Sequence, residues 1–359
     1  MADPEAPRRI LVTKLKQIGD VLLATPAIAA LRAEYPSARI WAAVPRSSAE
    51  ILKGNPDLDR VLLYDRAVVS AVRTALRLAA FRPQWVVQLG LTRRERLLGV
   101  LSGGRRRAGF AEPGATAGLT DAVPFDWSRH VVENSAILLE RLEVRTPVGP
   151  LVLAVTDEDT AWVEQELSVH QVAAGRPLAL VHPVTRWGFK SGRDEAMAEV
   201  MVGLRDRLRM AVAVTSGPDP AEIARARRIL GMAPGATLDF TGRLSLGRLA
   251  ALMRRARLVV TVDGAPMHMA AALQVPQVAL FGPTSEVNWA PWRAPHSIAA
   301  APMPCRPCGL DGCNGCKVSE CLLAVLPDQI LAAAAALLDR QTNPASFDAG
   351  RGHPDPSGG

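Results

Sequence analysis

The sequence has 359 residues, about twice the usual size of one domain, so two domains are the default expectation. Its 48% hydrophobic and 21% charged residues are typical of a folded globular protein and exclude disorder over most of the chain. A net charge of +7 favours anionic partners, but aromatic residues amount to only 4%. With so few rings available for base stacking, nucleic acid is not an expected partner.

The sequence shows no sign of a membrane span or a leader. No apolar run reaches the roughly 18 residues that a spanning helix needs, and the start, MADPEAPRRI, has acids and prolines where a signal peptide would have basic and then apolar residues. We therefore expect a cytoplasmic protein.

Short β-type runs alternate with helical stretches in the first half. Strands are predicted at 9–13, 39–44, 61–64 and 85–89, and helices at 21–34, 49–52 and 69–80, the first of them interrupted at 25–26. Such alternation predicts a parallel sheet with helices on both faces. An acidic helix at 157–167 then marks the crossing between domains.

The second half repeats the alternation. Strands are predicted at 178–182, 210–215, 238–240, 258–262 and 277–281, and helices at 194–208, 220–230, 246–256 and 266–273. The expected fold is α/β with two doubly wound domains, 1–165 and 166–340, facing a cleft where the carboxyl ends of the strands bind ligands. Residues 341–359, rich in Pro, Gly, Ser and Asp, are expected to be a disordered tail.

Three polar segments follow predicted strands and are candidates for chemistry. Asp20 lies at the first strand-to-helix turn, where it could cap the helix or act as a base. Segment 262–268, VDGAPMH, could bind a diphosphate through its N–H groups, although its Asp could be a cap and its His a core residue. Segment 181–190, VHPVTRWGFK, ends in one of only five lysines and could neutralise phosphate or be an exposed loop.

The five cysteines all lie within 305–321, as Cys-x2-Cys-x4-Cys-x2-Cys-x4-Cys. A reduced loop is the first interpretation, because the four residues between the two CxxC pairs are far fewer than the roughly 12 to 20 usual in zinc ribbons. A structural zinc at Cys305–Cys321 remains the alternative. A catalytic metal is not expected, since no carboxylate or His cluster accompanies the thiols.

Arginines form three clusters. They are Arg93, Arg94 and Arg96, then Arg105 to Arg107, then Arg225, Arg227 and Arg228. Most such clusters are solvated helix faces, and the alternative is contact with anionic ligands or surfaces.

Four signatures in order resemble a known family. They are KLKQIGDV at 14–21 with Thr25-Pro26 and Leu31-Arg32, LSG at 101–103 leading to Gly109-Phe110, His182-Pro183 with Thr185-Arg186-Trp187 and Lys190, and Asp263 with APMH at 265–268 and FGPT at 281–284. From about residue 9 to 338 the chain resembles glycosyltransferase family 9, the bacterial heptosyltransferases of the lipopolysaccharide inner core. The Cys-rich segment looks like the branch called lipopolysaccharide heptosyltransferase III.

The resemblance implies the two-domain GT-B architecture and metal-independent, inverting transfer without a cofactor. Asp20 matches the family's proposed catalytic carboxylate. The positions matching donor-binding residues are Thr185, Lys190, Glu222, Asp263, Gly264, Ala265, Met267 and His268. Two departures stand out: Ala265 replaces a common Gly, and Ser191-Gly192 stands where a Trp is usual.

The function expected from this resemblance is transfer of heptose from ADP-L-glycero-D-manno-heptose to a lipid A-linked core oligosaccharide. The enzyme would work at the inner face of the cytoplasmic membrane as a peripheral protein, with Arg93, Arg94 and Arg96 meeting the acceptor and the membrane. Two alternatives stay open: a transferase that uses another nucleotide sugar for a surface glycan, and a binding protein without catalysis. Presence of both Asp20 and Lys190 disfavours the second.

Overall fold

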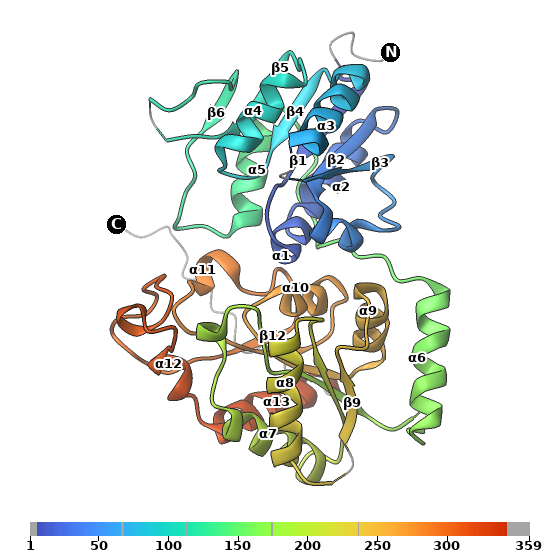
Figure 1. The fold of residues 1–359 in the computed structure, drawn as a ribbon, viewed down its shortest axis with the longest axis vertical. Helices are drawn as coiled ribbons and strands as arrows, with labels where there is room; N and C mark the ends of the chain where they lie inside the picture. Colours follow the sequence, from blue (N-terminus) through green and yellow to red (C-terminus); the bar gives the residue numbers. More distant parts are fainter. Residues whose placement is uncertain (1–5, 66–67, 113, 174, 236, 343–359) are drawn as a thin grey trace, which may run out of the picture.

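The computed structural model describes residues 6–65, 68–112, 114–173, 175–235 and 237–342. The chain forms two α/β units, one above the other, each built on a six-stranded parallel sheet (Figure 1). The predicted fold class is therefore confirmed.

The N-terminal sheet has the strand order β3-β2-β1-β4-β5-β6. Its strands are β1 (Arg9–Thr13), β2 (Arg39–Pro45), β3 (Arg60–Tyr64), β4 (Trp85–Gln88), β5 (Arg106–Phe110) and β6 (Asp121–Val123). The helices are α1 (Ile18–Leu22), α2 (Thr25–Glu34), the 3-10 helix η1 (Arg46–Leu52), α3 (Val68–Phe81), α4 (Arg93–Leu101) and α5 (Val131–Arg141). The order reverses between β1 and β4, which is where ligands of such sheets bind.

Alternating side chains of the strands divide the core of this unit. Ile10 and Val12 of β1 join the large core that includes α2 and α5, whereas Leu11 joins a smaller cluster with Leu78 of α3 and Leu98 of α4. Successive side chains of a strand point to opposite faces, so α2 and α5 cover one face and α3 and α4 the other.

The C-terminal sheet repeats this topology, with the order β9-β8-β7-β10-β11-β12. Its strands are β7 (Leu178–His182), β8 (Ala211–Ser216), β9 (Thr237–Thr241), β10 (Leu258–Val262), β11 (Gln277–Leu280) and β12 (His296–Ala299). The helices are α7 (Asp194–Asp206), α8 (Pro220–Met232), α9 (Leu246–Arg255), α10 (Ala265–Ala272), α11 (Glu286–Trp289), α12 (Glu320–Leu323) and α13 (Pro327–Thr342), with 3-10 turns η2 (Gly188–Lys190) and η3 (Cys313–Gly315). Here the order reverses between β7 and β10.

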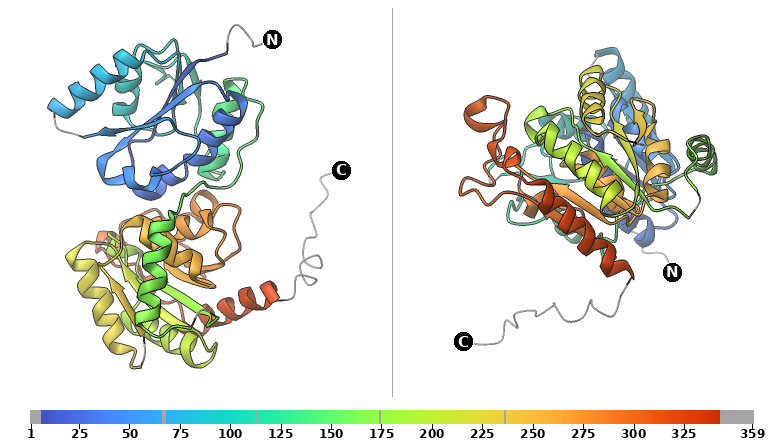
Figure 2. Two further views of the ribbon diagram at one scale, coloured as in Figure 1. Left: turned by 90° about the vertical axis from the view of Figure 1, so that its right-hand side faces the viewer. Right: turned by 90° about the horizontal axis from the view of Figure 1, so that it is seen from below.

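The expected acidic helix is α6 (Asp157–Val169), which runs alongside the C-terminal unit (Figure 2). It packs against α9, where the Cζ of Arg248 lies 4.2 Å from the centroid of the Trp162 ring. Arg243, in the loop before α9, pairs with Glu166 at 2.7 Å. The domain boundary expected between 165 and 166 thus falls inside α6, and the chain passes from one unit to the other before this helix begins.

The C-terminal end of α13 lies two residues inside the expected tail. The helix continues through Thr342, so Gln341 and Thr342 are helical and not disordered as predicted. Residues 343–359 lie outside the described residues.

The two units touch along a polar seam and share a core. Asn288 of α11 donates to the carbonyl oxygens of Trp127 and Arg129 across the seam, both at 2.8 Å. Trp292 donates to the Gly149 carbonyl at 2.9 Å. One continuous cluster of buried hydrophobic residues also runs through both units, so their strand ends are held facing one another.

Candidate active site

The site is centred on an ion pair at the carboxyl edge of the C-terminal sheet. Lys190 ends η2 in the loop after β7, and Asp263 follows β10, the adjacent strand. The Lys190 Nζ lies 2.7 Å from the Asp263 Oδ2, with side-chain exposures of 22% and 7%. Two of the three predicted polar segments therefore meet at the switch point, and a partly accessible cation is held there.

The turn after Asp263 supplies free backbone N–H groups. Gly264 is extended and precedes α10, so Asp263 is not the helix cap that one interpretation expected. Pro266 has no N–H, and the Met267 N–H donates to the Gly264 carbonyl at 3.2 Å. Within the described residues the N–H groups of Gly264 and Ala265 have no acceptor. They can bind an anion beside Lys190.

Two further donor-site candidates differ in their access to this turn. The Thr185 hydroxyl lies beside Gly264, 3.7 Å from where a Cβ on that glycine would stand. Met267 is fully buried and packs with Ala279 and Phe281. Its side chain belongs to the core, so only its backbone belongs to the turn.

His268 is buried next to the turn and lies close to Asp263 and Asp20. Burial lowers the pKa of His268 from 6.5 to about 4, although the carboxylates of Asp263 and Asp20 act in the opposite direction. Its Nδ1 has no hydrogen-bond partner among the described residues. The ring is therefore neutral at physiological pH, and both the core and the site interpretations apply to it.

Glu222 lies at the end of the neighbouring strand β8, in the first turn of α8. Its carboxylate accepts from the Gly217 N–H at 3.2 Å, and a Cβ on Gly217 would stand 2.6 Å from it. Burial raises the pKa of Glu222, while the nearby Arg186 lowers it. Glu222 is thus at the same sheet edge as Lys190, one strand away.

Asp20 reaches the site from the other unit. It lies half-buried in the first turn of α1, whose N-cap is Gln17, so Asp20 does not cap the helix. The adjacent Gly19 sits against α10: a Cβ there would lie 2.9 Å from His268 Cδ2 and 3.4 Å from Ala265 Cα. Asp20 of the N-terminal unit therefore follows a residue packed on the turn after Asp263, and its carboxylate is near enough to His268 to act on the pKa of that ring.

Gly192, one of the two departures from the family pattern, lies beside the end of the Cys-rich segment. A Cβ on Gly192 would stand 3.6 Å from the Leu322 carbonyl, and Leu322 also fills the space against Gly282, where a Cβ would lie 2.5 Å from its Cδ1. Leu322 is 1% exposed. The end of the Cys-rich segment thus packs beside Gly192 and Gly282.

Most of the clustered arginines are structural. Arg225 and Arg228 both pair with Asp194, Arg227 bonds Thr241, Arg106 pairs with Asp121, and Arg107 donates to the carbonyls of Gly118 and Gly104. Arg96 donates to the carbonyls of Ala115 and Phe110 and so holds the β5–β6 loop. Arg93, Arg94 and Arg105 are exposed and have no side-chain partner in the described chain.

The five cysteines are free thiols in a segment anchored by Arg306 and Cys321. Arg306 bonds the carbonyls of Gly282 and Ala301 and pairs with Glu286. Cys321 is buried, which raises the pKa of its thiol. In the described residues no three His, Cys, Asp or Glu side chains lie together as a metal-ligand group. The choice between a reduced loop and a structural zinc stays a prediction.

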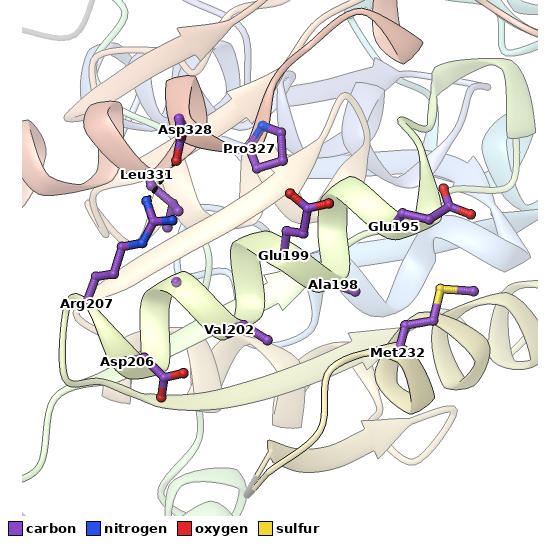
Figure 3. Close-up of a pocket in the computed structure, with 11 residues that line it drawn as sticks. Glu195, Ala198, Glu199, Val202, Asp206, Arg207, Met232, Pro327, Asp328 and Leu331 are labelled. Carbon is purple, nitrogen blue, oxygen red and sulfur yellow. Dashed lines mark hydrogen bonds and ion pairs between the residues drawn. The ribbon is translucent and has the colours of Figure 1, made fainter.

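A pocket of about 540 Å³ lies away from these residues (Figure 3). It is on the outer side of α7, where α13 and the end of α8 meet it, and its lining includes Glu199, Asp206, Arg207 and Asp328. It contains none of the predicted site residues.

His130 is a seam residue that the sequence did not indicate. It precedes α5, its Nδ1 accepts from the Val132 N–H, and its Nε2 therefore carries the proton and donates to the Ala290 carbonyl at 3.1 Å. The ring also stacks on Trp292, with centroids 4.7 Å apart. Its partners lie about 160 residues away in the chain, and no local pattern could have revealed them.

Two Rossmann-like units whose strand ends face each other across a cation and free N–H groups define a GT-B glycosyltransferase. The family model described as "Glycosyltransferase family 9 (heptosyltransferase)" matches residues 98–319. The chain therefore belongs to glycosyltransferase family 9. In the described residues no helix has the length and apolar character to cross a membrane.

Relatives and solved structures agree with this assignment. Lipopolysaccharide heptosyltransferase 3 of Escherichia coli is 26% identical over 292 residues, which cover 76% of this chain and 83% of that protein. The crystal structure of a glycosyl transferase family 9 protein from Veillonella parvula has a TM-score of 0.80 at 22% identity, covering 93% and 97% of the two chains. The structure of E. coli ADP-heptose lps heptosyltransferase II has a TM-score of 0.76 at 20% identity, covering 93% and 99%.

Proposed function

We propose that this enzyme transfers heptose from ADP-heptose to a sugar hydroxyl of the lipopolysaccharide inner core, with inversion at the anomeric carbon. The observation that carries the proposal is the packing of Gly19, the neighbour of Asp20, on the turn that follows the Lys190–Asp263 pair, with Asp20, Asp263 and Lys190 all close enough to act on His268. The names of the E. coli relatives, lipopolysaccharide heptosyltransferase 3 and ADP-heptose lps heptosyltransferase II, supply the sugar and the acceptor.

In this mechanism Asp20 accepts the proton of the acceptor hydroxyl as its oxygen attacks the anomeric carbon. The C–O bond to ADP breaks on the opposite face, so a β-linked donor gives an α-linked product. The leaving diphosphate gains negative charge, which Lys190, Thr185 and the N–H groups of Gly264 and Ala265 stabilise. A fixed cation and N–H groups supply this stabilisation, so we propose transfer without a metal.

The acceptor carries lipid A, so we also propose that the enzyme works at the inner face of the cytoplasmic membrane as a peripheral protein. Arg93 and Arg94 are exposed basic side chains of the N-terminal unit without a side-chain partner in the described residues, so they are available to phosphorylated sugars and headgroups. Each exposed basic residue near an anionic surface contributes on the order of 1 kcal/mol, and the attraction fades with salt.

The test is incubation of the purified enzyme with a panel of nucleotide sugars and core oligosaccharide acceptors, with and without EDTA. We expect ADP release and an α-linked product only with ADP-heptose, unaffected by EDTA. Turnover of another nucleotide sugar would assign a different surface glycan. Donor binding without any product would make the chain a binding protein.

A further inference from the structure

The outward face of α4 is apolar, which is unusual for a helix on the surface of a sheet. Its inner face is formed by Glu95, Leu98 and Gly99, all buried. Its outer face carries Leu97, Val100 and Leu101, which are 59%, 47% and 53% exposed. Residues three and four apart share a helix face, so these side chains form one continuous surface where polar residues would be expected.

Neighbouring segments also carry exposed apolar side chains. Leu91, in the loop before α4, is 39% exposed, and Leu76 of α3, the helix that packs beside α4, is 65% exposed. Gathered exposed apolar side chains mark a surface that binds another apolar phase.

Unpaired arginines flank the apolar surface at both ends of the helix. Arg93 and Arg94 begin α4, and Arg105 follows its end, while the intervening Arg96 is bonded to the β5–β6 loop. An apolar surface bordered by free cations is complementary to a bilayer with anionic headgroups, where leucines enter the acyl boundary and arginines meet phosphates.

The same helix is tied to the catalytic loop. The Glu95 carboxylate is fully buried and accepts from the Leu15 N–H at 2.7 Å as well as from the Thr92 N–H and hydroxyl. Leu15 belongs to the loop between β1 and α1, the helix that carries Asp20. The hydrogen bonds of Glu95 thus join α4 to the loop that precedes Asp20.

We propose that the outward face of α4 is an interfacial docking surface that inserts leucine side chains into an anionic lipid bilayer. This inference rests on the proposed function for its purpose, because the acceptor is lipid-linked, but it concerns a binding event that needs neither donor nor acceptor. It differs from a purely electrostatic contact in that part of the binding must survive high salt.

The experiment is sedimentation of the enzyme with vesicles of 30% phosphatidylglycerol and 70% phosphatidylethanolamine, at low salt and at about 1 M salt. The charge variant is Arg93→Gln with Arg94→Gln and Arg105→Gln, and the apolar variant is Leu97→Gln with Leu101→Gln. Matched controls on the other unit are Arg176→Gln with Arg254→Gln and Arg257→Gln, and Val169→Gln with Met232→Gln, all exposed.

We expect the wild-type enzyme to bind the vesicles at low salt and to retain part of this binding at high salt. The charge variant should bind on the order of a hundredfold more weakly at low salt, since each arginine contributes roughly fivefold. The apolar variant should lose the salt-resistant part, about tenfold or more. The controls should match wild type, and ADP binding should be retained in the apolar variant. Hydrogen exchange of wild type should show vesicle-induced protection of residues 93–101 and none of 157–169.

Three results would overturn the proposal. The first is that the wild-type enzyme does not bind these vesicles at low salt, and the second is that the apolar variant binds as well as wild type at high salt. The third is that wild type is a dimer which the apolar substitutions dissociate, because this result would assign the face to a second copy of the chain. Failure of the proposed function is distinguishable: it would appear as no transfer to a deacylated, soluble acceptor, with vesicle binding intact.

Discussion

Asp263 holds Lys190 where a diphosphate can reach it. The Asp263 carboxylate is nearly buried, whereas the Lys190 side chain is about a fifth exposed, so the cation stays accessible to a ligand. A lysine without this partner would sample many rotamers, because its side chain has four rotatable bonds. The ion pair therefore positions the charge before the donor arrives.

Replacement of Lys190 tests this role. Lys190→Ala should lower kcat by about 10²–10³, because the leaving diphosphate loses a charged partner. It should also lower Tm, since Asp263 is left nearly buried without a cation. The double variant Lys190→Ala with Asp263→Asn should recover stability but not activity, and the exposed Lys53→Ala is the control. An unchanged rate at all donor concentrations would make Lys190 a structural residue alone.

Asp20→Asn separates basicity from shape. The amide keeps the size of the carboxylate but cannot accept a proton, so transfer should fall by about 10²–10⁴ while ADP binding and Tm stay near wild type. Isothermal titration with ADP and a product assay measure the two effects. Wild-type turnover in this variant would remove Asp20 from the mechanism.

The sequence predicted the residues that directly follow strands and missed those defined by distant contacts. Lys190 and Asp263 could be placed together because the carboxyl ends of parallel strands share an edge. Glu95, however, accepts a hydrogen bond from the backbone N–H of Leu15, 80 positions away. The local sequence pattern indicates only its other role, the capping of α4 together with Thr92. The assignment of Asp20 as a base depended on resemblance and stays a prediction.

At the scale of elements, the strongly apolar strands were predicted almost to the residue. β1, β7 and β10 are confirmed with their predicted bounds. β5 and β6 were missed, since RRAGF and DAV lack an apolar signature. Their charged residues are tolerated because Arg106 of β5 pairs with Asp121 of β6 at 2.8 Å, a neutralisation that only the folded sheet provides.

The close approach of α1 and α10 depends on the absence of a side chain at Gly19. Gly19→Ala would place a Cβ 2.9 Å from the buried His268 ring, too close for van der Waals contact, so α1 must shift away from the donor turn. A displacement of about 1 Å at a catalytic group can reduce the rate on the order of a hundredfold.

We therefore expect Gly19→Ala to lower kcat by ten- to a hundredfold, an order-of-magnitude estimate, with a small loss of Tm. The matched control is Gly231→Ala in α8, where a Cβ would meet nothing within 4 Å. Steady-state kinetics and calorimetry of both variants decide the matter. If Gly19→Ala turns over like Gly231→Ala, the α1–α10 contact does not position Asp20.

At the scale of the whole molecule, burial disfavours the protonated form of three histidines in the described part of the chain. His130 spans the seam, His268 lies beneath Gly19, and His182 ends β7, where its Nδ1 lies 2.8 Å from the Thr215 hydroxyl. Burial lowers the pKa of each of them, for His182 and His268 from 6.5 to about 4. His130 and His268 lie where the two units meet. Protonation of these two rings should therefore weaken the contact between the units as well as the stability of the fold.

The sign of the resulting pH dependence follows from linkage. Because the pKa of each histidine is lower in the folded state, the unfolded chain binds more protons below pH 6.5, and stability present above that pH is lost as the pH falls toward 4. At pH 5 His182 and His268 each cost about 2 kcal/mol. The free energy of unfolding should therefore decrease between pH 7.5 and 5.

His182→Gln, which keeps a hydrogen bond to Thr215 but cannot be protonated, should reduce that decrease by about 2 kcal/mol relative to wild type. Calorimetric melting of wild type and of His182→Gln at pH 7.5, 6.5, 5.5 and 5 measures this effect. The difference between their free energies of unfolding at pH 7.5 corrects for any loss of packing in the variant. Parallel curves for the two proteins would mean that proton uptake by His182 does not contribute to acid unfolding.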